Sequence, residues 1–173
     1  MGFPIRTDLS AARVRELLHY DPETGVFTWI VQRKGKAQVG TIAGKNMPGI
    51  YRCIYVDSKP YRACRLAFLY MTGEWPKEFV DHRNGVKDDD RWENLREATR
   101  QQNSHNIPLR KDSTSGVRGV SWHKRERKWV AYVTDPQSRK RRYLGEFKSF
   151  DQAAAARRAA ETALFGEFRY GAN

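Results

Sequence analysis

The chain has 173 residues, with 32 lysines and arginines against 20 aspartates and glutamates, a formal net charge of +12. This length allows one or two domains and a core of modest size. The longest apolar run has six residues, Leu66 to Met71, and the mean hydropathy is −0.79; a membrane span needs about 20 apolar residues, so we expect no membrane protein. Two cysteines are too few for a disulfide scaffold, which favours a reducing cytoplasm.

The excess of positive charge favours a polyanionic partner, because neutralising phosphates releases condensed counterions. Residues 1–106 carry a net charge of +4 and residues 107–173 carry +8. A small domain often carries a net charge of about 2–8 for solubility alone, and this chain exceeds that range. A solubility surplus stays open as an alternative, but nucleic acid is the favoured partner.

The first part of the chain predicts helices separated by short strands. Ser10 is a suitable N-cap for a helix that follows it, and Gly73 is a suitable stop for a second helix. Between them, runs of β-branched and aromatic residues predict strands. The predicted strands are residues 26–31 and 51–56, the predicted turns are 20–25 and 57–60, and the second helix is 62–71.

Two stretches lack hydrophobic periodicity. Residues 33–49 form a basic, glycine-containing loop, in which Arg33, Lys34 and Lys36 are either DNA contacts or part of a plain flexible loop. Residues 107–115 are polar and include a proline, so they predict a linker.

Residues 116–170 predict three strands followed by one helix. The predicted strands are 119–122, 129–134 and 141–147. Ser149 and Gln152 form a capping box, and Gly166 is a suitable stop. Seven alanines between 153 and 163 give this helix a smooth face that can lie close to a sheet.

Polar residues follow an apolar, strand-like run in the middle of the chain. Asp81 and His82 end that run, and Asn94 lies 13 residues past Asp81. A capping box at Thr99 places Asn103 in the first turns of a helix. Two short strands, a loop and a helix would bring Asp81, His82 and Asn103 within reach of one another.

These residue types suit phosphodiester hydrolysis, which needs a base for the attacking water and a cation near the phosphate. Asp81 and Asn103 offer hard oxygen ligands that suit Mg²⁺ or Mn²⁺. Histidine titrates near neutrality, which makes His82 a suitable base, and Asn94 is suited to orient its ring. The same residues are ordinary in turns, so spacing alone leaves a structural interpretation open.

Three stretches carry a family resemblance. They are Tyr61-Arg-Ala-Cys-Arg-Leu-Ala-Phe-Leu-Tyr-Met-Thr-Gly-Glu-Trp-Pro76, Val80-Asp-His-Arg-Asn-Gly85 and Arg91-Trp-Glu-Asn-Leu-Arg-Glu-Ala-Thr-Arg-Gln-Gln-Asn103. They resemble the HNH endonucleases of phages and mobile introns, which are similar to homing endonucleases with the ββα-metal fold, and the resemblance covers roughly residues 9–106.

The resemblance implies a role for each polar residue. His82 would be the general base, Asp81 and Asn103 would bind one divalent metal ion, and Asn94 would support the histidine and the local loop. His105 is a nearby auxiliary candidate, with a solvent-facing helix residue as the alternative interpretation.

One position departs from this family. Relatives usually have histidine where this chain has Cys64, a residue that is not among the implied metal ligands. Loss of a supporting contact there would reduce activity. The alternative is a buried core thiol, the commoner role of a free cysteine, and we expect no bond to Cys53.

A second resemblance covers about residues 113–169. It is carried by Ser115-Gly-Val-Arg-Gly-Val-Ser-Trp122, Lys128-Trp-Val-Ala-Tyr-Val133, Tyr143-Leu-Gly-Glu-Phe147 and the alanine-rich helix. These stretches resemble the DNA-binding domain of plant ethylene-response factors (AP2/ERF), in which a three-stranded sheet lies in the major groove with a helix packed behind it. A β-ribbon fits that groove, and arginines can contact guanine edges or phosphates.

This second resemblance implies a set of DNA contacts. Arg118 and Arg141 occupy the most plausible DNA-facing positions, and for Trp129 the core and DNA interpretations are even. The basic run 139–142 favours phosphate contact over a solvated turn. The predicted contacts are Arg118, Trp122, Lys124, Arg125, Arg127, Lys128, Arg139, Lys140, Arg141, Arg142 and Tyr143.

The sequence therefore predicts an α+β protein of two modules. They are an N-terminal HNH nuclease domain at 1–106, with its ββα-metal motif at about 77–106, a linker at 107–115, and a DNA-binding domain at 116–170 in which a three-stranded antiparallel sheet is backed by one helix. The predicted activity is hydrolysis of double-stranded DNA with one Mg²⁺ or Mn²⁺ per active site and no other cofactor.

A monomer would nick DNA, and a homodimer would be needed for a double-strand break. The resemblance implies a phage- or prophage-encoded protein in the cytoplasm of a bacterial host. The main alternative is a non-cleaving, sequence-specific DNA-binding or regulatory protein derived from such a nuclease. An RNA-binding protein ranks behind both, because the chain has no RNA-recognition signature.

Overall fold

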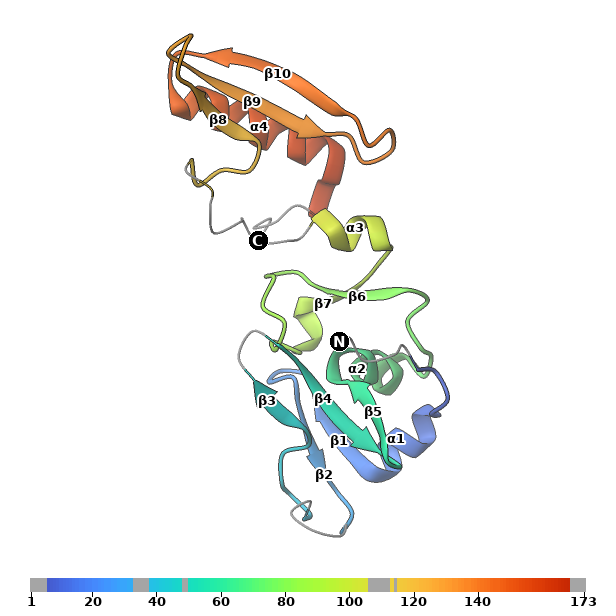
Figure 1. Ribbon diagram of the computed structural model, residues 1–173. Helices are drawn as coiled ribbons and strands as arrows, with labels where there is room; N and C mark the ends of the chain where they lie inside the picture. Colours follow the sequence, from blue (N-terminus) through green and yellow to red (C-terminus); the bar gives the residue numbers. More distant parts are fainter. Residues whose placement is uncertain (1–5, 33–37, 48–49, 106–112, 114, 169–173) are drawn as a thin grey trace. The chain divides into compact units, whose positions relative to one another are not determined.

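The computed structural model describes residues 6–32, 38–47, 50–105, 113 and 115–168. These residues form a mixed α and β structure with small antiparallel sheets and four α-helices (Figure 1). The chain divides into two compact units, one of residues 1–103 with residue 173, the other of residues 104–172. Within the described ranges, no helix has the length and apolar character that crossing a membrane requires. The candidates Arg33, Lys34 and Lys36, and most of the predicted linker, lie outside the described residues.

In the part of the first unit that the structure describes, there are three small sheets and two complete α-helices, and a third helix, α3, crosses the boundary at residue 103. Its elements are α1 (Ala11–Leu17), β1 (Leu18–Asp21), β2 (Val26–Trp29), β3 (Lys45–Met47), β4 (Ile50–Val56), β5 (Lys59–Arg62), α2 (Ala63–Thr72), β6 (Phe79–His82), the 3-10 turn η1 (Trp92–Asn94), β7 (Leu95–Ala98) and α3 (Arg100–His105). The sheets have the orders β1-β2, β3-β4-β5 and β6-β7, and every pairing is antiparallel.

Local signals determine where the helices of this unit begin and end. The Ser10 hydroxyl accepts a hydrogen bond from the Arg13 backbone N–H at 3.2 Å, as an N-cap does. Gly73 has a left-handed φ of 84°, and its N–H donates to the Leu69 carbonyl at 3.0 Å. The predicted cap at Ser10 and the predicted stop at Gly73 are both confirmed.

Three strands lie wholly or partly where the sequence predicted a loop or a turn. β1 ends at Asp21, within the predicted turn 20–25. β3 falls within the basic loop, and β5 begins at Lys59 within the predicted turn 57–60. The turn itself is made by Asp57 and Ser58, whose φ angles are 48° and 62°. Pro60 is compatible with β5 because this strand is the edge of its sheet, where a missing N–H leaves the ladder intact.

Helix α2 forms the centre of the first core. Its residues from Ala63 to Leu69 are all buried, and they pack with residues of α1, β4 and β5. Arg65 is buried among them and donates to the carbonyls of Glu78, at 2.6 Å, and Pro76, at 3.3 Å. This helix therefore fixes the segment that leads into β6.

The second unit contains one sheet and one long helix. β8 (Val120–His123), β9 (Lys128–Thr134) and β10 (Arg141–Phe147) form an antiparallel sheet of order β10-β9-β8, and α4 (Phe150–Phe165) lies along one face of it, followed by the 3-10 turn η2 (Gly166–Phe168) (Figure 1). Ala153 packs in one buried cluster with Val120 and Ala131, so small side chains let the helix approach the sheet closely. The hydroxyl of Ser149 accepts from the Gln152 N–H at 3.2 Å, as the sequence predicted.

Candidate active site and nucleic-acid interface

The pairing of β6 with β7 buries an ion pair. Asp81 lies directly opposite Arg96 in the register of the two strands. The Oδ2 atom of Asp81 accepts from Arg96 Nε at 2.8 Å and pairs with Nη2 at 2.7 Å. Both residues are buried, with exposed fractions of 3% and 6%. The predicted metal ligand Asp81 is thus held in place by a buried cation.

The next residue along β6, His82, pairs with a carboxylate that the sequence did not single out. His82 Nε2 lies 3.1 Å from Asp90 Oδ1, and the two side chains are 3% and 2% exposed. A carboxylate in this position orients the imidazole ring and fixes which nitrogen carries a proton. The ring of Tyr51, from β4, lies beside that of His82 with 5.7 Å between centroids.

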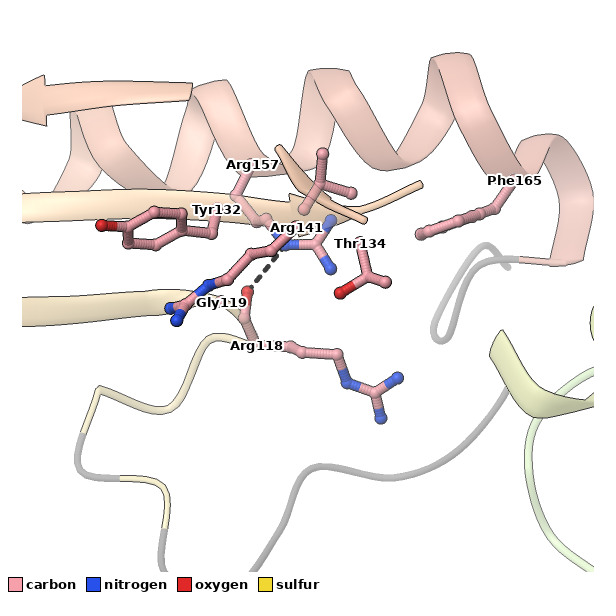
Figure 2. Close-up of a pocket in the computed structure, with 8 residues that line it drawn as sticks. Arg118, Gly119, Tyr132, Thr134, Arg141, Arg157 and Phe165 are labelled. Carbon is pink, nitrogen blue, oxygen red and sulfur yellow. Dashed lines mark hydrogen bonds between the residues drawn. The ribbon is translucent and has the colours of Figure 1, made fainter. Parts of the chain in front are cut away.

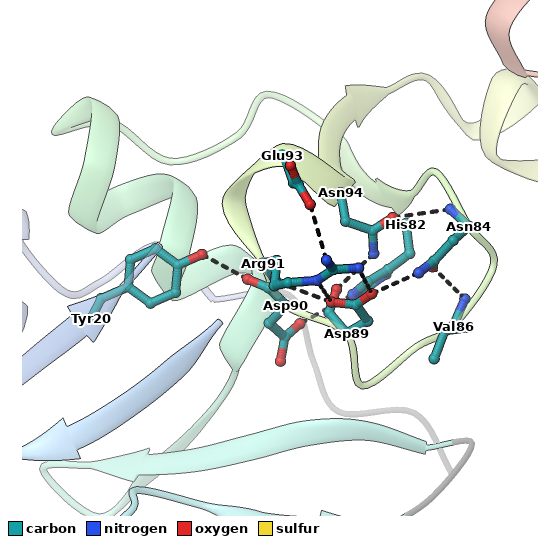
Figure 3. A network of polar contacts seen from close by, with 9 residues as sticks. All are labelled: Tyr20, His82, Asn84, Val86, Asp89, Asp90, Arg91, Glu93 and Asn94. Atoms are coloured by element: carbon teal, nitrogen blue, oxygen red, sulfur yellow. Dashed lines mark hydrogen bonds and ion pairs between the residues drawn. The ribbon is translucent and has the colours of Figure 1, made fainter. Parts of the chain in front are cut away.

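Asn94 holds the loop between β6 and β7. Its side-chain oxygen accepts from the Asn84 N–H at 3.0 Å, and its amide donates to the Asp89 carbonyl at 2.7 Å (Figure 3). Asp89 is in turn bound by Arg91, and this hydrogen bond lowers the pKa of the Asp89 carboxyl. Asn94 therefore supports the loop that contains Asp90, whereas the ring of His82 contacts Asp90 itself.

The turn between β1 and β2 fixes the backbone of Asp90. The hydroxyl of Tyr20 donates to the Asp90 carbonyl at 2.6 Å (Figure 3). The Trp92 N–H donates to the Pro22 carbonyl at 2.9 Å. Gly25 has a φ of +70°, and a Cβ atom there would lie 2.3 Å from the Asp90 carbonyl carbon. Only glycine allows this close approach, so the hairpin and the loop lie in direct contact.

Cys64 lies in the same buried cluster. A potential ligand atom from each of Cys64, His82 and Asp90 lies within 4.8 Å of the other two. Burial, and then the nearby carboxylate of Asp90, raise the pKa of the Cys64 thiol to about 12. Both cysteines are free, and Cys53 is partly exposed on β4.

Asn103 lies on α3, which follows β7 after a single residue. The predicted capping box is confirmed, since Gln102 and Thr99 exchange two hydrogen bonds, of 2.8 and 3.2 Å. Asn103 is partly buried, and its N–H donates to the Thr99 carbonyl at 3.0 Å. The auxiliary candidate His105 ends this helix, and its side chain lies outside the described residues.

Two cations lie over the aromatic ring that covers His82. The Arg62 guanidinium carbon is 4.5 Å from the centroid of the Tyr51 ring, and Lys87 Nζ is 5.7 Å from it. These two residues could not be predicted from the sequence, because β5 and the loop after β6 come close to Tyr51 only in the folded chain. Together they place positive charge around the Tyr51 ring, which lies beside that of His82, and positive charge there suits an approaching phosphate.

In the second unit, the sheet face opposite α4 carries aromatic and basic side chains. Arg141 lies over the Tyr132 ring, 3.7 Å from its centroid, and the rings of Tyr132 and Tyr143 lie 5.4 Å apart. Tyr143 is 53% exposed. Lys128, at the other end of β9, pairs with Glu146 at 2.9 Å. Arginines and tyrosines arranged in this way suit contacts with phosphates and base edges.

Trp122 belongs to the other face. It lies opposite Trp129 in the sheet register, and the two rings are 5.3 Å apart. Trp129 in turn contacts Phe150 of α4, with centroids 5.0 Å apart. Trp122 is therefore on the helix side of the sheet, and Trp129 is a core residue. The remaining predicted contacts Lys124, Arg125, Arg127, Arg139, Lys140 and Arg142 are exposed.

A pocket of about 170 Å³ opens at the end of this sheet where β9 ends and β10 begins. Figure 2 shows three arginines around it, Arg118, Arg141 and Arg157. Arg157 is buried, its Nε donates to the Arg118 carbonyl at 2.9 Å, and its Nη2 pairs with Glu161 at 2.9 Å. Its Nη1 has no hydrogen-bond partner among the described residues. The chemistry of this pocket suits an anion.

Comparisons with known proteins agree with the first of the two resemblances. A family model described as HNH endonuclease matches residues 61–105. The chain is 40% identical over 63 residues to Protein 3.8 of Escherichia phage T7, and these residues are 36% of this chain and 52% of that protein. The chain thus spans about half the length of this relative. No solved structure matches the present chain.

The matched segment runs from β5 to α3 and contains every residue of the predicted metal and catalytic set. It begins at Tyr61, so the expectation of a nuclease domain that starts at the N-terminus is corrected: the match does not include residues 1–60. Those residues nevertheless supply Tyr20, Gly25 and Tyr51, which contact the matched segment.

Proposed function

We propose that this chain is a metal-dependent DNA endonuclease, encoded by a phage or prophage, with His82 as its general base. The observation that carries the proposal is the match of residues 61–105 to HNH endonucleases, combined with the placement of Asp81, His82 and Asn94 around one loop. The positive charge of Arg62 and Lys87 beside this loop supports a phosphate-containing substrate.

The donor set fits a hard divalent cation. The Asp81 carboxylate and the Asn103 carboxamide offer oxygen ligands, as Mg²⁺ and Mn²⁺ prefer. Asp81 already binds the guanidinium of Arg96, which fixes the position of its carboxylate. When bound, the metal would neutralise charge on the phosphate and on the leaving oxygen.

The chain's own residues perform the proton transfer. His82 takes a proton from water, the water oxygen attacks phosphorus, and the bond from phosphorus to the 3′ oxygen breaks with its electron pair on that oxygen. A proton from solvent water converts the 3′ oxygen to a 3′-hydroxyl and leaves a 5′-phosphate, and His82 releases its own proton to solvent. Asp90 acts as a positioning residue for the His82 ring. Because His82 is 3% exposed, DNA has to displace part of the cover over it.

The second unit would bind the DNA and hold it for cleavage. The open sheet face with Arg141, Tyr132 and Tyr143, and the arginine pocket beside it, support this assignment. We propose that it acts as an ethylene-response-factor-type reader whose sheet enters the major groove. One active site per chain would give a nick, and a double-strand break would need a homodimer or a second binding event.

Incubation with supercoiled plasmid tests the proposed activity. With Mg²⁺ or Mn²⁺ we expect open-circular product, and with EDTA we expect none. Linear product as the first species would instead indicate paired cutting. A gel shift on the same plasmid, measured in EDTA, reports binding separately from cleavage.

A non-cleaving DNA-binding protein is the second candidate. The burial of His82 against Asp90 and the pairing of Asp81 with Arg96 favour it, because both implied catalytic residues already have partners. A gel shift without any cleavage product in either Mg²⁺ or Mn²⁺ would support this candidate and contradict the nuclease.

Replacing Arg141 with alanine is expected to weaken DNA binding and to reduce the slope of log affinity against log salt by about 1. The loss of one phosphate contact is the reason, since Arg141 lies on the open sheet face. Fluorescence anisotropy over a salt series measures it. Arg158→Ala removes the same charge from an exposed position of α4 and should leave the slope unchanged. Equal slopes for both variants would contradict the assignment of this face.

A further inference from the structure

The buried cluster of Cys64, His82 and Asp90 has the composition of a metal site. The three residues come from α2, from β6 and from the loop before η1, and their side chains are at most 3% exposed. One potential ligand atom of each lies within 4.8 Å of the others. A thiolate, an imidazole and a carboxylate are the ligand types of tetrahedral zinc.

The distances are close to those that zinc requires. Bond lengths of about 2.0–2.3 Å in a tetrahedron place ligand atoms about 3.4–3.6 Å apart. His82 Nε2 and Asp90 Oδ1 are 3.1 Å apart in the structure. Side-chain adjustments on the order of 1 Å would therefore bring all three atoms to one ion, without a change of backbone path.

An independent observation points to a cation at the same place. Asp90 Oδ2 is buried and has no hydrogen-bond partner among the residues that the structure describes. A buried carboxylate oxygen without a partner is costly, and native structures rarely contain one. Tyr20 and Gly25 hold the Asp90 backbone against the cluster, so the carboxylate cannot easily turn away. A bound cation would satisfy this oxygen.

We propose that Cys64, His82 and Asp90 form a binding site for Zn²⁺ or a similar thiophilic divalent cation, and that occupation of this site stops DNA cleavage. The site differs from the proposed Mg²⁺ site in its ligands, because Asp81 and Asn103 offer oxygen alone, and Mg²⁺ does not bind thiolate readily. The inhibitory part rests on the proposed nuclease function, since a metal on the His82 ring takes away the base. The binding part does not.

Cobalt substitution tests the binding part directly. Titration of the full chain with Co²⁺ should give a thiolate-to-cobalt charge-transfer band and the visible bands of tetrahedral cobalt, saturating at one ion per chain and lost on addition of Zn²⁺. Cys64→Ser and Asp90→Asn should abolish the charge-transfer band. Cys53→Ser, a matched change at the partly exposed cysteine of β4, should keep it. Absence of the band from the wild-type chain, or its loss in Cys53→Ser alone, would overturn the proposal.

Melting temperatures show whether each variant is folded and whether it binds Zn²⁺. A ligand that binds the native state raises the melting temperature as its concentration rises. Zn²⁺ should therefore raise the melting temperature of the wild-type chain and of Cys53→Ser, but not that of Cys64→Ala, a second small substitution at the buried position. The same rise in Cys64→Ala would overturn the assignment of Cys64 as a ligand.

Cleavage tests the inhibitory part. With Mg²⁺ in excess, a few equivalents of Zn²⁺ should slow plasmid nicking by the wild-type chain at least tenfold. Cys64→Ser should resist the addition of Zn²⁺, so that its nicking rate with Zn²⁺ stays within twofold of its own rate without Zn²⁺. Equal inhibition of both proteins would overturn the inhibitory role. If the wild-type chain cuts under no condition, the nuclease proposal fails, and the cobalt spectrum still decides whether the site binds metal.

Discussion

Replacing Arg96 with alanine is expected to lower the free energy of unfolding by about 3–5 kcal/mol, because it leaves the buried Asp81 carboxylate without its cation. Asp81 is 3% exposed and receives two contacts from the guanidinium, at 2.8 and 2.7 Å. Chemical denaturation followed by circular dichroism measures the change. Mg²⁺ should recover part of the loss if Asp81 is a metal ligand, since a cation bound there replaces the missing charge.

Arg13→Ala is the matched control. Arg13 pairs with Asp57 on the surface, where the two side chains are 39% and 48% exposed. Solvent-exposed ion pairs contribute about 0–1 kcal/mol, so this variant should be nearly as stable as the wild-type chain. Similar small losses in both variants would show that the buried pair adds little, and no recovery with Mg²⁺ would count against Asp81 as a ligand.

Replacing His82 with alanine is expected to reduce the cleavage rate by about 10²–10⁴-fold, the usual contribution of a general base. DNA affinity in EDTA should not change, since the binding surface of the second unit is untouched. Single-turnover nicking and a gel shift measure the two quantities. His19→Ala removes an exposed histidine of β1 and should affect neither. Full cleavage by His82→Ala would contradict the mechanism.

Steady-state nicking kinetics of a second variant distinguish the general base from the residue that positions it. Asp90→Asn should lower kcat while KM for DNA stays at the wild-type value, because Asp90 contacts the His82 ring and lies buried away from solvent. A change in KM alone would show that Asp90 acts on the DNA-binding surface instead.

Features that depend on a few neighbouring residues could be predicted from the sequence. The caps at Ser10 and Ser149 and the stop at Gly73 occur at the expected positions, since each needs one side chain or one left-handed residue at a fixed spacing. The edge strand β5 was missed because Pro60 reads as a turn residue until the neighbouring strand is known.

The partner of His82 could not be predicted in this way. Asp88, Asp89 and Asp90 follow one another in the sequence and are equivalent in composition. Their difference is tertiary: Asp89 binds Arg91, whereas Asp90 lies against His82 and is held by Tyr20, 70 residues earlier in the chain. The sheet face that Trp122 occupies could not be predicted either, because it depends on the strand register that pairs Trp122 with Trp129.

The contact of Gly25 with Asp90 also determines how much of this chain an isolated active site would need. A fragment of residues 61–105 alone would keep His82 and Asp90. It would lose the β1–β2 hairpin, whose Tyr20 binds the backbone of Asp90. A piece that keeps this contact has to include the β1–β2 hairpin as well as the matched segment. A larger residue at Gly25, outside the matched segment, is therefore expected to displace Asp90 and with it the partner of His82.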